Sequence, residues 1–254
     1  MRRLLLVLLA AAVLLGGAFV VLAPASLLAT RVERGTGGAL VARQVEGTVW
    51  RGRAVLAAAN TQLPVAWVVD PPALLNGEVQ ARIGPYEGAG RVPRADVIAG
   101  RDRIILRDVD LTLPLPLAVE ALGGGLAQRA GLVADGDLAI RSTQLDWAPP
   151  TVNGALEIVW RAARLTVPTQ APLDLGDVTA TLVASGERLA GPVANSGGVL
   201  DIRGDVTVRP DRSAAIALLL TPRSADDATL ARALAVVGTP EGDGWRVSWQ
   251  TPPR

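Results

Sequence analysis

The sequence has 254 residues, of which 25 are basic, all of them Arg, and 24 are acidic, so the formal net charge is +1. This small charge provides no long-range field for gathering a polyanion, and we expect no nucleic-acid partner. The chain has neither Cys nor His. This excludes thiol nucleophiles, disulfides, the usual zinc sites and a Ser-His-Asp relay. We therefore expect a protein that is not an enzyme and that holds no cofactor and no metal.

An apolar segment opens the chain. Arg2 and Arg3 are followed by twenty positions without a charged side chain, from Leu4 to Ala23. A helix of this length spans about 30 Å, the thickness of the hydrocarbon core of a bilayer. Because positive charge stays on the cytoplasmic side, Arg2 and Arg3 predict a cytoplasmic N-terminus and an exported body. The sequence thus predicts a single membrane anchor.

A cleaved signal peptide is the alternative, since Ala23-Pro24-Ala25 has the small-x-small pattern of a processing site. The apolar run is longer than the central region of roughly 7 to 15 residues in a signal peptide, which favours the anchor. The body is exported in either case. We expect residues 1–25 to be the stub and anchor, residues 26–43 a juxtamembrane linker, and residues 44–254 one β domain.

Few helices are expected in the body. Residues 71–75, with two Pro, predict a single helical turn. Leu115 to Gln128 predicts a short helix that ends at the glycines 123–125, because each Gly weakens a helix by about 1 kcal/mol. A later helix has Ser224 as its N-cap, Asp226 and Asp227 in its first turn, an apolar stripe of Leu230, Leu234 and Val237, and Gly238 as its stop.

Strands dominate the body. Val199 to Val208 alternates apolar and polar residues, which is the period of a half-buried strand. The same alternation predicts strands around residues 156–160, 178–182, 216–220 and 245–249. Turns are expected at Asn76-Gly77, Asp135-Gly136, Asn153-Gly154, Ser196-Gly197-Gly198 and Gly242-Asp243-Gly244. The sequence predicts a mainly β fold, either a curved antiparallel sheet or a β-sandwich or roll, with one or two short helices.

Tryptophans are six of the eight aromatic residues, and most of them fall in expected strands. Large aromatic side chains in strands usually pack in the core, and we prefer that interpretation. The alternative is a set of exposed stacking platforms for a glycan, formed by Trp50, Trp147 or Trp245.

The segment Gly47-Thr48-Val49-Trp50-Arg51-Gly52-Arg53-Ala54 resembles the N protein of the bacterial general secretion pathway, the type II secretion system. The similarity continues, in order, through residues 67–77, 154–165, 234–240 and 245–249. The motif residues, which we expect to be structural, are Gly47, Thr48, Trp50, Gly52, Ala54, Trp67, Gly77, Trp160, Gly238 and Trp249.

The resemblance implies an accessory component of the inner membrane with a periplasmic β domain, whose partners are other proteins of the secretion apparatus. The family has no catalytic residues to transfer. Two other classes remain open from the sequence. One is an envelope protein similar to the AsmA-like group, which handles lipid in an apolar β groove. The other is the periplasmic glycan-binding module.

Overall fold

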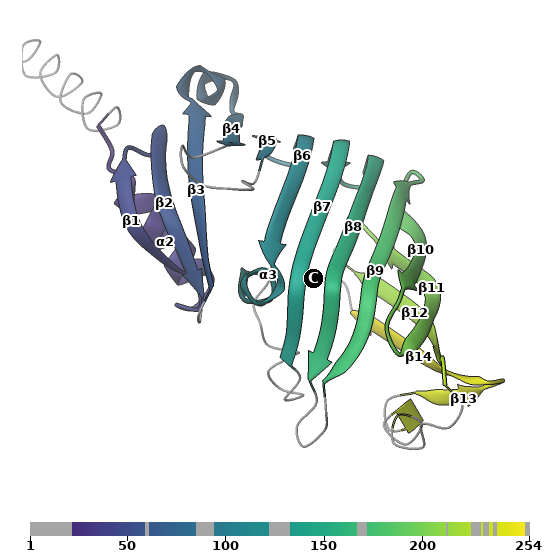
Figure 1. Ribbon diagram of the computed structural model, residues 1–254. Coiled ribbons are helices and arrows are strands. Elements are labelled where there is room, and N and C mark those ends of the chain that lie inside the picture. The colour runs from purple at the N-terminus through teal and green to yellow at the C-terminus, as the bar shows by residue number, and fades with distance from the viewer. Residues whose placement is uncertain are drawn as a thin grey trace, which may run out of the picture.

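The protein is described by a computed structural model (Figure 1). The structure describes residues 22–58, 61–84, 94–121, 133–166, 172–211, 213–224, 230, 234–235 and 238–251. Arg2, Arg3 and residues 4–21 of the expected anchor lie outside this part of the chain, as do Asp226, Asp227 and Val237 of the expected late helix. No helix within the described part has the length and hydropathy needed to cross a bilayer.

Fourteen strands of the described residues form one sheet. In its first half these are β1 (Val41–Gly47), β2 (Arg51–Ala58), β3 (Thr61–Asp70), β4 (Val79–Gly84), β5 (Arg94–Ala99), β6 (Ile104–Pro114) and β7 (Val133–Ala148). In its second half they are β8 (Thr151–Thr166), β9 (Leu173–Ala184), β10 (Leu189–Ser196), β11 (Leu200–Val208), β12 (Ala214–Pro222), β13 (Thr239–Glu241) and β14 (Gly244–Thr251).

The sheet is an antiparallel meander. From β1 to β12 each strand pairs with the next one along the chain, and β14 then pairs with β12 and carries β13 as the last strand. The expected mainly β fold and curved antiparallel sheet are confirmed. The alternative of two packed sheets is wrong, because one sheet contains every named strand and curls on itself (Figure 1).

Short helices accompany the sheet. Helix α2 (Ser26–Gly35) and the first three residues of β1 lie in residues 26–43, which were expected to be a linker. The 3-10 helix η1 (Pro71–Asn76) and α3 (Leu115–Ala121) confirm the two short helical segments expected there. Of the late helix, Leu230 and Leu234 are helical and buried, and the Gly238 N–H closes its end by donating to the Leu234 carbonyl at 2.9 Å.

The two faces of the sheet differ sharply in polarity. Side chains that alternate along a strand point to opposite faces, and the cross-strand register places Leu156, Leu182, Trp160 and Val178 on one of them. This face is concave, because Trp160 of β8 packs in one cluster with residues of β12 and β14 across the curl. The members of that cluster are Trp160, Ala163, Leu165, Leu173, Leu175, Val178, Leu200, Ile202, Leu218, Leu220, Leu230, Leu234 and Trp245.

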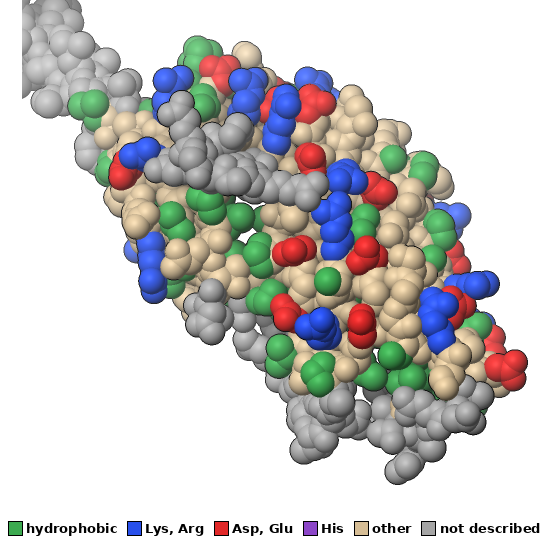
Figure 2. Space-filling view, in the orientation of Figure 1, with side chains coloured by type: hydrophobic (Ala, Val, Ile, Leu, Met, Phe, Trp, Pro, Cys, Tyr) green, Lys and Arg blue, Asp and Glu red, His purple; other side chains and the backbone are tan. Residues whose placement is uncertain are grey.

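Two further apolar clusters fill the concave face. One holds Leu40, Leu56, Ala58, Leu63, Val65, Leu113 and Leu117 together with Val32 of α2, so α2 and α3 cover the concave side of β1 to β3. The other runs over β6 to β11 around Leu145, Val152, Leu182 and Leu189, which are at most 6% exposed. The convex face carries acidic and Arg side chains in an interspersed pattern (Figure 2).

Glycines allow the sheet to bend. A Cβ at Gly191 of β10 would lie 1.9 Å from the Thr181 carbonyl oxygen, and one at Gly204 of β11 would lie 2.0 Å from that of Ala217. These distances are far inside van der Waals contact, so neighbouring backbones approach only because both side chains are absent. The curl of the second half follows from this close approach.

Two of the expected turns are wrong. Asp135-Gly136 lies inside β7 and Asn153-Gly154 lies inside β8. Gly136 has φ +118° and Gly154 has φ +113°, and both sit where the β7–β8 register shifts, so these glycines form bulges within long strands. The chain reverses instead at Pro149-Pro150. The turns at Gly77, Gly197-Gly198 and Gly242-Asp243 are confirmed.

Candidate functional site

The first family motif forms a tight turn between β1 and β2. Gly47 has φ +89°, and a Cβ there would lie 2.4 Å from the Arg51 carbonyl oxygen. The Thr48 N–H donates to that carbonyl at 2.9 Å. The Thr48 hydroxyl accepts the N–H groups of Trp50 at 3.3 Å and Arg51 at 3.2 Å. Gly47 and Thr48 therefore stabilise the backbone conformation of the turn.

This turn holds the chain where it leaves the apolar N-terminal segment. The Ala25 N–H donates to the Gly47 carbonyl at 3.1 Å, and the Val49 N–H donates to the Ala23 carbonyl at 2.9 Å. Pro24 and Thr48 thereby form an antiparallel bridge, and Ala25 is only 1% exposed. This bridge, η1 and the Pro149-Pro150 turn lie at the same end of the sheet. We call it the entry end.

A second motif pair supports the turn from β3. Gly52 lies directly opposite Trp67 in the β2–β3 register. A Cβ at Gly52 would lie 2.5 Å from Cζ2 of Trp67, so the indole occupies the space that Gly52 leaves. The Trp67 indole N–H donates to the Val49 carbonyl at 3.2 Å. Trp67 thus connects β3 to the turn through its ring nitrogen.

Trp50 was expected in a strand and lies instead in the connection between β1 and β2. Its carbonyl accepts the Val69 N–H at 2.6 Å, which fastens the end of β3 to the same turn. The local reason is the bond from the Trp50 N–H to the Thr48 hydroxyl, because such a side-chain bond competes with strand pairing.

The other motif residues are spread over the sheet. Ala54 is buried in β2, and Gly77 ends η1 in the left-handed conformation with φ +74°. The Trp160 indole N–H donates to the Asp135 carbonyl at 2.9 Å across the β7 bulge. Trp249 of β14 is 40% exposed. The structure therefore brings together only the motif residues of the entry end, namely Gly47, Thr48, Trp50, Gly52 and Trp67.

Two of the tryptophans considered as glycan platforms are packed. Trp147 lies against Leu145 and Val152 on the concave face, and Trp245 lies against the cluster around Leu230 and Leu234. A stacking platform needs an accessible ring face. Their packing favours the core role expected of strand tryptophans.

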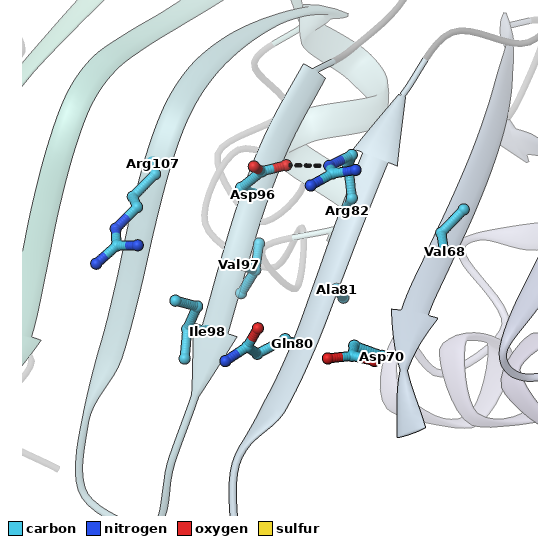
Figure 3. Close-up of a pocket in the computed structure, with 9 residues that line it drawn as sticks. All are labelled: Val68, Asp70, Gln80, Ala81, Arg82, Asp96, Val97, Ile98 and Arg107. Atoms are coloured by element: carbon cyan, nitrogen blue, oxygen red, sulfur yellow. Dashed lines mark hydrogen bonds and ion pairs between the residues drawn. The ribbon is translucent and has the colours of Figure 1, made fainter. Parts of the chain in front are cut away.

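The convex face has a hollow of about 390 Å³ over β3 to β6. Arg82 and Asp96 form an ion pair of 3.0 Å within it, and Arg107 of β6 stands beside them (Figure 3). The remaining lining residues are Val68, Asp70, Gln80, Ala81, Val97 and Ile98. No Ser, Thr or Tyr is among these lining residues, so they offer a paired Arg and Asp and no hydroxyl nucleophile.

Two further surface ion pairs connect adjacent parts of the sheet. The Arg103 guanidinium donates to Asp146 at 2.8 Å, and this hydrogen bond lowers the pKa of Asp146 and raises the pKa of Arg103. At the last hairpin, the bond from Arg246 to Glu241 lowers the pKa of Glu241. Both shifts come from cross-strand pairing, and neither places an unpaired acid or base in a cleft.

Asn195 is a key residue that was not identified from the sequence. Its amide donates to the carbonyls of Leu175 at 2.7 Å, Gly197 at 3.1 Å and Leu200 at 3.0 Å. Its side-chain oxygen accepts the Ile202 N–H at 2.8 Å. One amide thereby joins β9, β10 and β11 in the curled second half of the sheet. An Asn just before a Gly-Gly turn was the only available signal, and it indicates a turn as readily as a cross-link.

Comparison with known proteins identifies the family. The sequence profile of the type II secretion system protein N matches residues 38–248, which include the entry-end motif and extend into β14. No curated protein and no solved structure matches the chain. The match covers most of the chain and confirms the resemblance carried by the Gly47–Ala54 motif. The chain therefore belongs to the protein N family of the type II secretion system.

Proposed function

We propose that this protein is a non-enzymatic scaffold of the type II secretion system. Residues 4–23 anchor it in the inner membrane, and the β sheet stands in the periplasm, where it supports the export of folded proteins across the outer membrane. The partners are other proteins of the apparatus.

The clamp on residues 23–25 is the observation that carries this proposal. The family motif forms the turn that holds the chain immediately after the apolar segment, because the Gly47 carbonyl accepts the Ala25 N–H and the Val49 N–H donates to the Ala23 carbonyl. If the segment before residue 23 is held in a membrane, a rigid connection at this place sets the orientation of the whole sheet relative to that membrane. A substrate site would instead gather motif residues around a hollow.

Deletion of the gene tests the role in secretion. We expect secreted enzymes to accumulate in the periplasm while their export across the inner membrane continues, and the intact gene should restore their appearance in the medium. Unchanged levels of every secreted protein in the medium would contradict the scaffold role.

The topology has a separate test, because the chain contains no Cys. A single Cys at Arg2 or at Val133, which is 61% exposed, gives a unique labelling site. In spheroplasts, a membrane-impermeant maleimide should label V133C and spare R2C until the membrane is lysed. Equal labelling of both before lysis would contradict an anchor with a cytoplasmic N-terminus.

A lipid-handling role is the second candidate, and the apolar concave face favours it. The centre of that face is filled by its own side chains, since Val152 and Ala163 are 0% exposed. Toward the entry end, Val79 and Ile104 remain 43% and 45% exposed. Mass spectrometry of the purified protein should detect lipid at a fixed molar ratio if acyl chains lie there. A lipid content that follows the detergent wash without a plateau would contradict this role.

A further inference from the structure

Exposed apolar side chains gather at the entry end of the sheet. The helix η1 presents Leu75 with 90% exposure and Leu74 with 42% exposure at its outer side. Other strongly exposed apolar side chains at this end are Leu22, Leu27, Val79 and Ile104. A residue as large as Leu at 90% exposure has lost nearly all contact with the protein, so the fold alone gives no reason for its position.

The backbone places η1 next to the point where the N-terminal segment joins the sheet. β3 runs toward this end and leads directly into η1 at Pro71. The Val69 N–H is bonded to the Trp50 carbonyl, and the same turn is bonded to Ala23 and Ala25. Neighbouring strands lie about 4.8 Å apart, so two strand spacings place the end of β3 at Val69, from which the chain continues into η1, roughly 10 Å from the bridge at Pro24. Figure 1 shows η1 as the coil above β3, on the same side as the end of the N-terminal segment.

Leu22 is the exposed apolar residue of the entry end that precedes the bridge at Pro24. It lies one residue before Ala23, the last position of the apolar run, and it is 70% exposed. The exposed leucines of η1 and Leu22 thus lie at the same end of the sheet. Lipid is the occupant that fits, because the sequence segment that ends at Ala23 has the length and composition for a bilayer, and apolar side chains at the boundary of a bilayer are stabilised by burial among the acyl chains.

We propose that η1 is a membrane-contacting tip, which inserts Leu74 and Leu75 into the periplasmic surface of the same bilayer that holds residues 4–23. This inference rests on the proposed anchor. The anchor and the tip form two separate contacts with the bilayer, and the turn at Gly47–Gly52 couples them. Together they restrict the tilt of the sheet, which a single helix on a flexible link leaves free.

The test uses the full chain reconstituted in phospholipid vesicles, with one Cys at a time carrying the environment-sensitive dye NBD. The sites are L75C on the tip, L22C at the end of the apolar run, and V133C as a matched control. Val133 is 61% exposed and lies at the opposite end of β7, a strand of 16 residues and therefore about 50 Å long.

We expect the emission of NBD at L75C and L22C to shift to the blue and to be quenched several-fold more by lipids brominated near the head group than the emission at V133C. Emission at L75C equal to that at V133C, with L22C still quenched, would overturn the tip and leave the anchor intact. Loss of quenching at both L22C and L75C would overturn the anchor and the tip together. No other protein is present in the vesicles, so shielding at L75C reports lipid.

Discussion

Glycines control both the entry end and the curl, and they do so in different ways. At the entry end, Gly52 leaves space for a side chain, the indole of Trp67. In the curl, Gly191 and Gly204 leave space for the backbone of the adjacent strand. A side chain can move when it is crowded, whereas a paired backbone moves only with its strand. Gly191 and Gly204 should therefore tolerate a new side chain less well than Gly52 does.

The largest effect is expected for Gly204→Ala. The new Cβ would lie 2.0 Å from the Ala217 carbonyl oxygen, so β11 and β12 must separate. We expect a loss of about 4 kcal/mol in the free energy of unfolding. Urea unfolding in detergent, followed by Trp fluorescence, measures it. Gly35→Ala is the control, because nothing lies within 4 Å of a Cβ there, and its stability should stay equal or rise. Equal stability of the two variants would contradict the proposal that the close approach of the backbones at Gly204 causes the curl.

Asn195→Ala tests the same region without adding volume. It removes four hydrogen bonds, three to carbonyl oxygens and one from the Ile202 N–H. Because buried backbone groups lose their partners, we expect a loss of about 3 kcal/mol. Hydrogen exchange should show faster exchange of the Ile202 amide, while the Val49 amide at the entry end stays protected. A uniform increase in exchange across both regions would show that the curl and the entry end do not open separately.

Gly52→Ala should cost less than either change in the curl. Its Cβ would meet Trp67 Cζ2 at 2.5 Å and the Glu46 carbonyl oxygen at 2.8 Å, and the ring must turn away. We expect a loss of about 2 kcal/mol, together with a changed Trp emission spectrum. Trp67→Phe is the companion variant, because it removes both the 3.2 Å bond to Val49 and the part of the indole that fills the space at Gly52. In the Trp67→Phe background, Gly52→Ala should therefore cost about 1 kcal/mol less than it does in the wild type. An equal loss in both backgrounds would contradict the role of Gly52 as space for the ring.

The smallest effect is expected for Arg246→Ala at the last hairpin, where the ion pair with Glu241 is exposed. Arg246 lowers the pKa of Glu241 in the folded state, so this pair stabilises the fold above the ordinary pKa of the carboxyl group. That contribution is lost as the pH falls through the lowered pKa. The variant should thus match the wild type in strong acid and differ slightly at neutral pH. A difference that grows on acidification would contradict the direction of the shift.

Local patterns predicted much of this fold. The alternation from Val199 to Val208 corresponds to β11, and the prolines at residues 71–72 begin η1. The pairs Asp135-Gly136 and Asn153-Gly154 were wrongly predicted as turns, because the same sequence signal marks a Gly with positive φ in a turn and in a strand bulge. Helix α2 was missed because its ten residues directly follow the apolar segment and were interpreted as a linker.

The entry end shows where prediction from sequence stops. The motif residues Gly47, Thr48 and Gly52 were identified from the resemblance, and their structural character was expected. The contacts of this turn with Ala23 and Ala25 were not predictable, because these backbone hydrogen bonds join segments that are more than twenty residues apart in the sequence. The role of Gly204 depends in the same way on Ala217, which belongs to the next strand. Long-range contacts of this kind leave no periodic trace in the sequence.

The order of the strands has a consequence for how the protein forms. Up to β12, each strand finds its partner in the strand made just before it, so every pairing closes a short stretch of chain. Contacts between near neighbours in sequence form quickly, and each completed hairpin offers a template edge to the strand that follows. The sheet can therefore grow in the direction of synthesis, from the corner held by Pro24 and Thr48 outward, and only β14 must wait for a strand that is not its immediate predecessor.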